Sequence, residues 1–124
     1  MSDTTNIRIL IVDDEVSYTT ILTKRLALRG ISATPVNSGE EAVQALRGNT
    51  FDVALLDLKM ENMDGLEVLK IFTVMAPETN VIILTGHGGE QEARESMQLG
   101  AFDYVVKPVE LDTLVKKIHE AASA

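Results

Sequence analysis

Short apolar runs alternate with helix-like segments along the chain, and this alternation restricts the possible folds more than any other feature. The runs cover residues 7–12, 53–56, 81–84 and 104–106, and a weaker segment covers 32–36. Continuous apolar runs of this length are typical of strands that are covered on both faces. Pro35 in the weaker segment has no amide to donate, so we expect this strand at an edge of the sheet. The pattern predicts five strands.

The segments between these runs have helical spacing. The clearest apolar stripe consists of Leu111, Leu114, Val115, Ile118 and Ala122, a spacing typical of one face of a helix. Helix boundaries are indicated by the capping pairs Ser38 with Glu41 and Asp64 with Glu67, and by Gly30 and Gly100. Alternating strands and helices pair in parallel with right-handed crossovers. The sequence therefore predicts an α/β fold with helices on both faces of one sheet.

The length and the charge restrict the domain organisation and the partners. A chain of 124 residues fits one domain, which we expect to cover residues 1–124 with a core at about 6–122. Nineteen acidic and 11 basic residues give a formal net charge of −8, which repels phosphate backbones and anionic lipids. Neither direct nucleic-acid binding nor membrane binding is expected.

The absence of cysteine excludes a disulfide framework and a thiolate site. The first six residues lack the pattern of a signal peptide, and no apolar run approaches the ~18 residues of a membrane span. These features predict a cytoplasmic protein.

Polar side chains follow four of the predicted strands. Asp13 and Asp14 follow the first, Asp57 the third, Thr85 the fourth and Lys107 the fifth. Ligands of open α/β sheets bind beyond the carboxyl ends of the strands, so these side chains are expected at one edge. Clustered carboxylates repel one another unless a cation neutralises them. Magnesium suits such a cluster because it also binds phosphate oxygens, and a carboxylate that accepts a phosphoryl group needs nearby cations and hydrogen-bond donors.

Five short motifs together resemble the response-regulator receiver family of two-component signal transduction. They are Asp13-Asp14, Leu55-Leu56-Asp57, Met63-Asp64-Gly65, Thr85-Gly86 and Lys107-Pro108, and the resemblance covers essentially the whole chain. It implies a doubly wound, flavodoxin-like parallel sheet with strand order 2-1-3-4-5 and five helices. It also implies a signalling domain rather than an enzyme, one that promotes its own phosphoryl transfer and dephosphorylation.

The resemblance implies an acceptor and a magnesium site. Asp57 would accept the phosphoryl group. Asp14 would bind Mg²⁺ directly and Asp13 largely through water, while Asp57 and the backbone carbonyl of Lys59 would complete the protein ligands. The chain departs from the family pattern at Glu61, where many relatives have proline. This side chain could alter the metal affinity or simply face water.

The resemblance also implies residues that sense and time the phosphorylation. Thr85 and Lys107 would bind the phosphoryl oxygens, and Tyr104 would swing inward as Thr85 moves. Lys59 and His87 would flank the site and tune the lifetime of the phosphoryl group. The expected partners are a sensor histidine kinase or a histidine phosphotransfer protein, and a downstream effector or output domain. Homodimers through the fourth helix, fifth strand and fifth helix are a habit of the family.

Three other functions stay open at this point. A haloacid-dehalogenase-like phosphatase also has a nucleophilic aspartate, but it needs a second carboxylate where this chain has Lys59. A flavodoxin-like cofactor carrier needs a hydroxyl-rich phosphate loop, whereas Asp13-Asp14-Glu15 would repel phosphate. The third is a binding module that is never phosphorylated.

Overall fold

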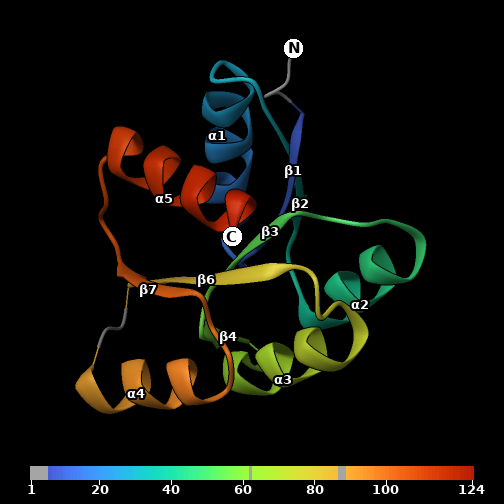
Figure 1. Cartoon of the computed structure of the whole chain (residues 1–124), viewed down its shortest axis with the longest axis vertical. Helices are drawn as coiled ribbons and strands as arrows, with labels where there is room; N and C mark the ends of the chain where they lie inside the picture. Colours follow the sequence, from blue (N-terminus) through green and yellow to red (C-terminus); the bar gives the residue numbers. More distant parts are fainter. Residues whose placement is uncertain (1–5, 62, 87–88) are drawn as a thin grey trace.

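The computed structural model describes residues 6–61, 63–86 and 89–124 (Figure 1). In chain order, its elements are β1 (Ile7–Val12), α1 (Val16–Ala27), β2 (Ile31–Val36), α2 (Gly39–Gly48), β3 (Val53–Leu56), β4 (Lys59–Met60), β5 (Met63–Asp64), α3 (Gly65–Met75), β6 (Asn80–Thr85), α4 (Glu90–Gln98), β7 (Asp103–Val106) and α5 (Leu111–Ser123). Within the described residues, no helix is long and apolar enough to cross a membrane.

The main sheet has the order β2-β1-β3-β6-β7, and all of its neighbouring strands are parallel. This order confirms the predicted 2-1-3-4-5 sheet, because β6 and β7 are its fourth and fifth strands in sequence. Pro35 lies on the edge strand β2 and pairs in register with Ile11 of β1. The small antiparallel ribbon of β4 and β5 was not predicted, since two residues are too few to give a strand pattern.

Helices cover both faces of the sheet (Figure 1). Helices α1 and α5 lie on one face, and α2, α3 and α4 lie on the other. Strand β1 shows how the two layers are filled: Ile9 and Ile11 belong to the core under α1 and α5, whereas Leu10 and Val12 belong to the core under α2 and α3. The continuous apolar runs of the sequence therefore correspond to strands that are buried on both faces.

The helix boundaries follow the predicted signals. The Ser38 hydroxyl accepts a hydrogen bond from the Glu41 amide at 3.1 Å, and Asp64 Oδ1 accepts one from the Leu66 amide at 3.0 Å. Both bonds satisfy amides that a helix leaves without an internal partner at its first turn. The caps fix where α2 and α3 begin, and α3 begins directly after the loop that follows β3.

Candidate functional site

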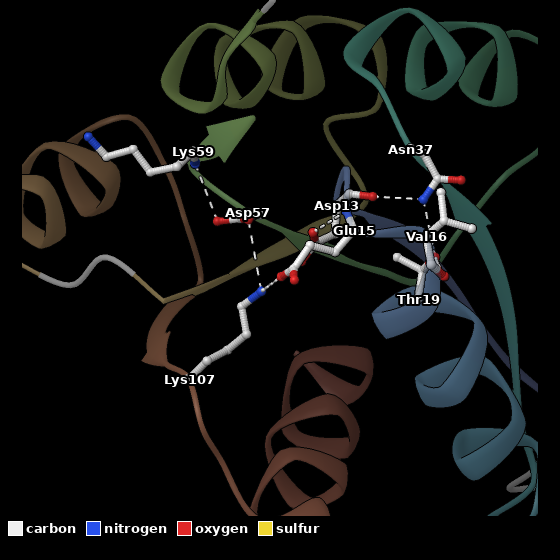
Figure 2. A network of polar contacts seen from close by, with 8 residues as sticks. All are labelled: Asp13, Glu15, Val16, Thr19, Asn37, Asp57, Lys59 and Lys107. Atoms are coloured by element: carbon white, nitrogen blue, oxygen red, sulfur yellow. Dashed lines mark hydrogen bonds and ion pairs between the residues drawn. The ribbon is translucent and has the colours of Figure 1, made fainter. Parts of the chain in front are cut away.

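Four of the predicted site residues, Asp13, Asp14, Asp57 and Lys107, lie together at the carboxyl edge of the sheet. Figure 2 shows Asp13, Asp57 and Lys107 pointing toward one another. Hydrogen bonds between neighbouring strands continue past the strand ends and hold the backbone there. The Asp57 amide donates to the Val12 carbonyl at 3.0 Å, and the Lys107 amide donates to the Thr85 carbonyl at 2.8 Å. The side chains that follow β3 and β7 are therefore attached to rigid backbone.

Among the described residues, Asp13, Asp14 and Asp57 form a cluster in which one oxygen from each side chain lies within 4.8 Å of the others. Asp13 is only 2% exposed and Asp57 only 6%, while Asp14 is half-buried. Burial and mutual repulsion both disfavour ionised carboxylates. An arrangement of this kind requires nearby positive charge.

Backbone amides hold each carboxylate of the cluster in place. The Glu15 amide donates to Asp13 Oδ1 at 3.0 Å, the Glu61 amide to Asp14 Oδ2 at 2.9 Å, and the Lys59 amide to Asp57 Oδ1 at 3.3 Å. An ionised carboxylate has about four lone-pair positions, so one such bond leaves room for a metal ion. The oxygen-only donor set fits a hard divalent cation such as magnesium.

Lys107 provides the positive charge beside this cluster. Its Nζ lies 2.8 Å from Asp13 Oδ2, 3.8 Å from Glu15 Oε1 and 3.9 Å from Asp57 Oδ2, and the side chain is 14% exposed (Figure 2). The same nitrogen lies 4.4 Å from the centroid of the Tyr18 ring. The Lys107–Pro108 peptide bond is cis.

The surroundings of Lys107 keep it charged. Burial by itself would lower the pKa of this amine, but the hydrogen bond to Asp13 and the negative charges of Asp13 and Asp57 outweigh burial, so its pKa is raised. The pKa of Tyr18 is also raised, mainly by burial, although Lys107 partly offsets the effect. At neutral pH the site therefore contains an ammonium group next to a neutral phenol.

The proposed switch residues lie on neighbouring strands. Thr85 ends β6 and is fully buried. Tyr104 on β7 is half-buried, pairs in register with Ile83, and accepts a hydrogen bond from the Gly89 amide to its hydroxyl at 3.4 Å. Tyr104 thereby connects the last strand to the start of α4. His87, the other residue expected to tune the site, lies outside the described residues.

Lys59 and Glu61 lie at the exposed side of the site. Lys59 Nζ forms an ion pair with Glu92 Oε2 of α4 at 3.3 Å, and Figure 2 shows its side chain pointing away from Asp57. The amine is therefore held by α4 and does not lie over the expected acceptor. The Glu61 side chain is exposed, and its contact with Asp14 is made by the backbone amide.

The loop after β3 depends on a close backbone contact at Gly65. The Gly65 amide donates to the Leu58 carbonyl at 3.0 Å, and a Cβ atom at this position would overlap the Leu58 backbone. The glycine of the Met63-Asp64-Gly65 motif therefore lets the start of α3 pack directly behind Asp57. Any larger residue would force the backbone of Asp57 and Leu58, or the start of α3, to shift.

Sequence reasoning missed several residues that support the site. Asn37 Nδ2 donates to the Asp13 carbonyl at 2.8 Å and to the buried Thr19 hydroxyl at 3.1 Å (Figure 2). Asn37 directly follows β2, so the rule that located the other residues at strand ends could have found it. Thr19 and Tyr18 lie within α1, where the sequence has no signal that distinguishes them from ordinary helix residues.

Comparisons with known proteins agree with this geometry. A family model described as response regulator receiver domain matches residues 9–119. The chain is similar to the transcriptional regulatory protein ZraR of Escherichia coli, with 37% identity over 94% of this chain. It is also similar to the DNA-binding transcriptional regulator NtrC of Klebsiella pneumoniae, with 41% identity over 91% of this chain. The chain spans only 26% and 24% of these two relatives.

A solved structure has the same architecture. It is that of a CheY-like response regulator receiver domain protein from Methanospirillum hungatei, which is 28% identical with a TM-score of 0.91. The alignment covers 97% of this chain and 95% of that one. The likeness therefore extends through the sheet, the helices on both faces and the carboxyl edge that carries the acidic cluster.

Proposed function

Because the chain belongs to the response regulator receiver domain family, a family of signalling domains that accept a phosphoryl group, we propose that its acceptor is Asp57. The observation that carries this proposal is the position of the Asp57 carboxylate. It is nearly buried, it is oriented by the Lys59 amide, and it faces the Lys107 ammonium at 3.9 Å. Asp57 lies at a rigid strand end beside a cation that can offset the negative charge of the incoming phosphoryl group. Asp13 also lies beside this cation, but its carboxylate already accepts a hydrogen bond from Lys107 at 2.8 Å.

We assign the cation site to the same cluster. Asp13, Asp14 and Asp57 can together hold a metal ion, and we propose that the ion is Mg²⁺, with the Lys59 carbonyl as a further ligand. When bound, it would offset the negative charge of the phosphoryl oxygens as they approach the carboxylates. The ordered amide contacts of the carboxylates support this assignment, since they orient the oxygens before a ligand arrives.

Asp57, Lys107 and Thr85 each have a role in the phosphoryl transfer. An oxygen of Asp57 attacks phosphorus while the bond between phosphorus and a histidine nitrogen of the donor breaks. The imidazole leaves with the electron pair of that bond and ends as a neutral ring after it takes up a proton. Lys107 stabilises the negative charge on the phosphoryl oxygens, and the Thr85 hydroxyl donates a hydrogen bond to one of these oxygens. Hydrolysis by water later returns the carboxylate of Asp57 and inorganic phosphate.

The donor is a sensor histidine kinase or a histidine phosphotransfer protein, and the recipient of the signal is an output domain or a separate effector. The names of the relatives support this arrangement, because ZraR and NtrC are named as transcriptional regulators and this chain matches about a quarter of each. We place the domain in the cytoplasm, where such donors obtain their phosphoryl groups.

The output face consists of α4, β7 and α5. Phosphorylation pulls Thr85 toward the phosphoryl group, Tyr104 then turns inward, and the population of α4 conformations shifts. The half-exposed apolar residues Met97 of α4 and Val106 of β7 support a contact role for this face, since they are 47% and 48% exposed. A homodimer through the same face is one way in which the change is transmitted.

The acceptor assignment is tested by chemical phosphorylation. The chain is incubated with acetyl phosphate in the presence of Mg²⁺ or of a chelator, and the intact mass is recorded. We expect one added phosphoryl group only with Mg²⁺, and borohydride reduction followed by peptide mapping should locate it at Asp57. A phosphoryl group at another residue, or none under either condition, would contradict the proposal and favour a binding module that is never phosphorylated.

A further inference from the structure

Lys107 contacts an aromatic ring as well as carboxylates. Its Nζ lies over the Tyr18 ring, 4.4 Å from the ring centroid. This separation is well within the ~6 Å at which an ammonium is attracted by the electron-rich face of an aromatic ring. Lys107 is 14% exposed, and Tyr18 is half-buried, so water weakens the attraction less than it would on an open surface.

The carboxylates alone do not fix the position of this amine. The shortest contact of Lys107 is with Asp13, at 2.8 Å, but Asp13 also belongs to the acidic cluster that we assign to Mg²⁺. Its carboxylate cannot pair with the ammonium and bind a metal ion with full strength in both contacts. The same applies to Asp57, which lies 3.9 Å from the amine. The contact with Glu15 is 3.8 Å long, and the Glu15 side chain is 66% exposed, so that pair is weak. During phosphoryl transfer, Lys107 needs a partner that does not bind metal.

The Tyr18 ring has the properties of such a partner. It lies in the first turns of α1 and packs against the core that contains Leu22 and Leu114. Its side chain has only two rotatable bonds, whereas that of lysine has four, so the ring is the more rigid of the two groups. The neutral ring neither binds a hard cation nor repels phosphoryl oxygens. The ring therefore restrains the ammonium without competing with the phosphoryl oxygens or the metal ion for their binding partners.

We propose that Tyr18 is a positioning residue for phosphoryl transfer, whose ring holds the Lys107 ammonium beside Asp57. The inference rests on the proposed function, because it concerns the rate at which Asp57 is phosphorylated. The phenol oxygen is not needed for this role. The conservative replacement Tyr18→Phe therefore keeps the function, whereas Tyr18→Leu removes the ring but keeps an apolar side chain.

The contact itself is tested by NMR on the chain without metal or donor. The protons on Cε of Lys107 are expected to resonate upfield of those of the other lysines, because Cε is bonded to the Nζ that lies 4.4 Å from the centroid of the Tyr18 ring. The upfield shift should persist in Tyr18→Phe and vanish in Tyr18→Leu. An ordinary shift for Lys107 in the unmodified chain would overturn the proposal, and this measurement requires no variant that might fail to fold.

The role is tested by the rate of phosphorylation with acetyl phosphate and saturating Mg²⁺. We expect Tyr18→Leu to lower the rate constant roughly fivefold, with Tyr18→Phe close to the unmodified chain. Thermal unfolding checks that both variants are folded. Equal rates for all three proteins, with a slow Lys107→Ala variant, would refute the role of Tyr18 and leave the proposed function intact. No phosphorylation of the unmodified chain would instead contradict the proposed function, and the NMR result would still report the ring contact.

Discussion

Strand β3 has an aspartate at each end, and the two residues have opposite surroundings. Asp52 precedes the strand, is exposed, and accepts a hydrogen bond from the Arg8 amide to its Oδ2 at 2.8 Å. Asp57 follows the strand, is 6% exposed, and lies in a cluster with Asp13 and Asp14. Four buried apolar residues separate the two carboxylates. The two aspartates therefore differ in burial and in contacts because the neighbouring strands place different residues beside each end of β3.

At the amino ends of the strands, polar and charged groups are paired within the fold, as in the ion pair between Asp103, which begins β7, and Lys117 at 2.8 Å. The Thr79 hydroxyl donates to the Phe51 carbonyl at 2.8 Å, and Asn80 Nδ2 donates to the Ala121 carbonyl at 2.8 Å. The carboxyl ends bring charged residues to one place, because parallel strands end at the same edge. The amino edge of the sheet thus has its polar groups satisfied by contacts between elements of the fold. The carboxyl edge instead gathers three carboxylates beside the single ammonium of Lys107, and a bound cation would balance the remaining negative charge.

Exchange of each aspartate for asparagine gives the largest expected difference between the two ends. Asp57→Asn should abolish phosphorylation, because an amide is not nucleophilic enough to attack phosphorus. Asp52→Asn should be phosphorylated at the rate of the unmodified chain, since Asp52 lies at the opposite edge of the sheet. Intact mass after incubation with acetyl phosphate and Mg²⁺ measures both. Equal phosphoryl incorporation in the two variants would show that Asp57 is not the acceptor.

Binding of Mg²⁺ should stabilise the folded chain through the carboxylates that follow the strands, and the aspartate that precedes β3 should not contribute to this effect. At a tenfold excess over its Kd, Mg²⁺ is expected to raise the free energy of unfolding by about 1.4 kcal/mol, because it binds the folded cluster and not the unfolded chain. The same rise is expected in Asp52→Asn and little or none in Asp14→Asn. Urea unfolding with and without Mg²⁺ measures the effect. A full rise in Asp14→Asn would remove Asp14 from the ligand set.

Most of the fold could be predicted because strand burial and capping are local signals. The runs at 7–12 and 53–56 agree with β1 and β3 as observed, and Pro35 correctly indicated an edge strand. The ribbon of β4 and β5 could not be predicted, since two residues in each strand are too few to give a pattern of side chains. The hydrogen bond from the Gly65 amide to the Leu58 carbonyl lies directly beside the ribbon.

From the sequence pattern alone, the site could be predicted only at residues that end or directly follow a strand, whereas Lys59 and Tyr104 were predicted from the family resemblance. Asp13, Asp57 and Lys107 share that property, and the topology brings them together. Tyr18 and Glu92 lie within helices, so their contacts with Lys107 and Lys59 depend on how α1 and α4 pack, which the sequence pattern does not specify. These are tertiary contacts between different elements, so they cannot be predicted from the spacing of residues along one helix or strand.

Removal of the Asp52 carboxylate should lower the stability of the fold without changing the phosphorylation of the chain. Asp52→Ala leaves the Arg8 amide without its acceptor, and because this site is exposed, water compensates part of the loss. We expect the free energy of unfolding to fall by about 1 kcal/mol, with no change in the rate of phosphorylation. Asp52→Asn retains an acceptor oxygen and should recover most of the loss. A slower phosphorylation in Asp52→Ala would mean that the two ends of β3 are coupled.

The smallest expected effect concerns the second lysine near Asp57. Lys59 is 53% exposed and paired with Glu92, whereas Lys107 is 14% exposed and held among carboxylates and a ring. A surface ion pair contributes roughly 0.2 to 1 kcal/mol, so Glu92 holds Lys59 only weakly. Glu92→Gln should release the amine, which can then reach the phosphoryl oxygens and obstruct the path of the attacking water.

We therefore expect Glu92→Gln to slow the loss of the phosphoryl group about two- to threefold, the size that one surface ion pair allows. Lys59→Met should have little effect, because the amine is held away from Asp57 in the unmodified chain. The double variant should decay like Lys59→Met, since without the amine the Glu92 substitution has nothing to release. The decay is followed by intact mass at fixed pH and saturating Mg²⁺ after removal of the donor. Faster decay in Lys59→Met, with no change in Glu92→Gln, would instead indicate that Lys59 shields the acyl phosphate despite its ion pair with α4.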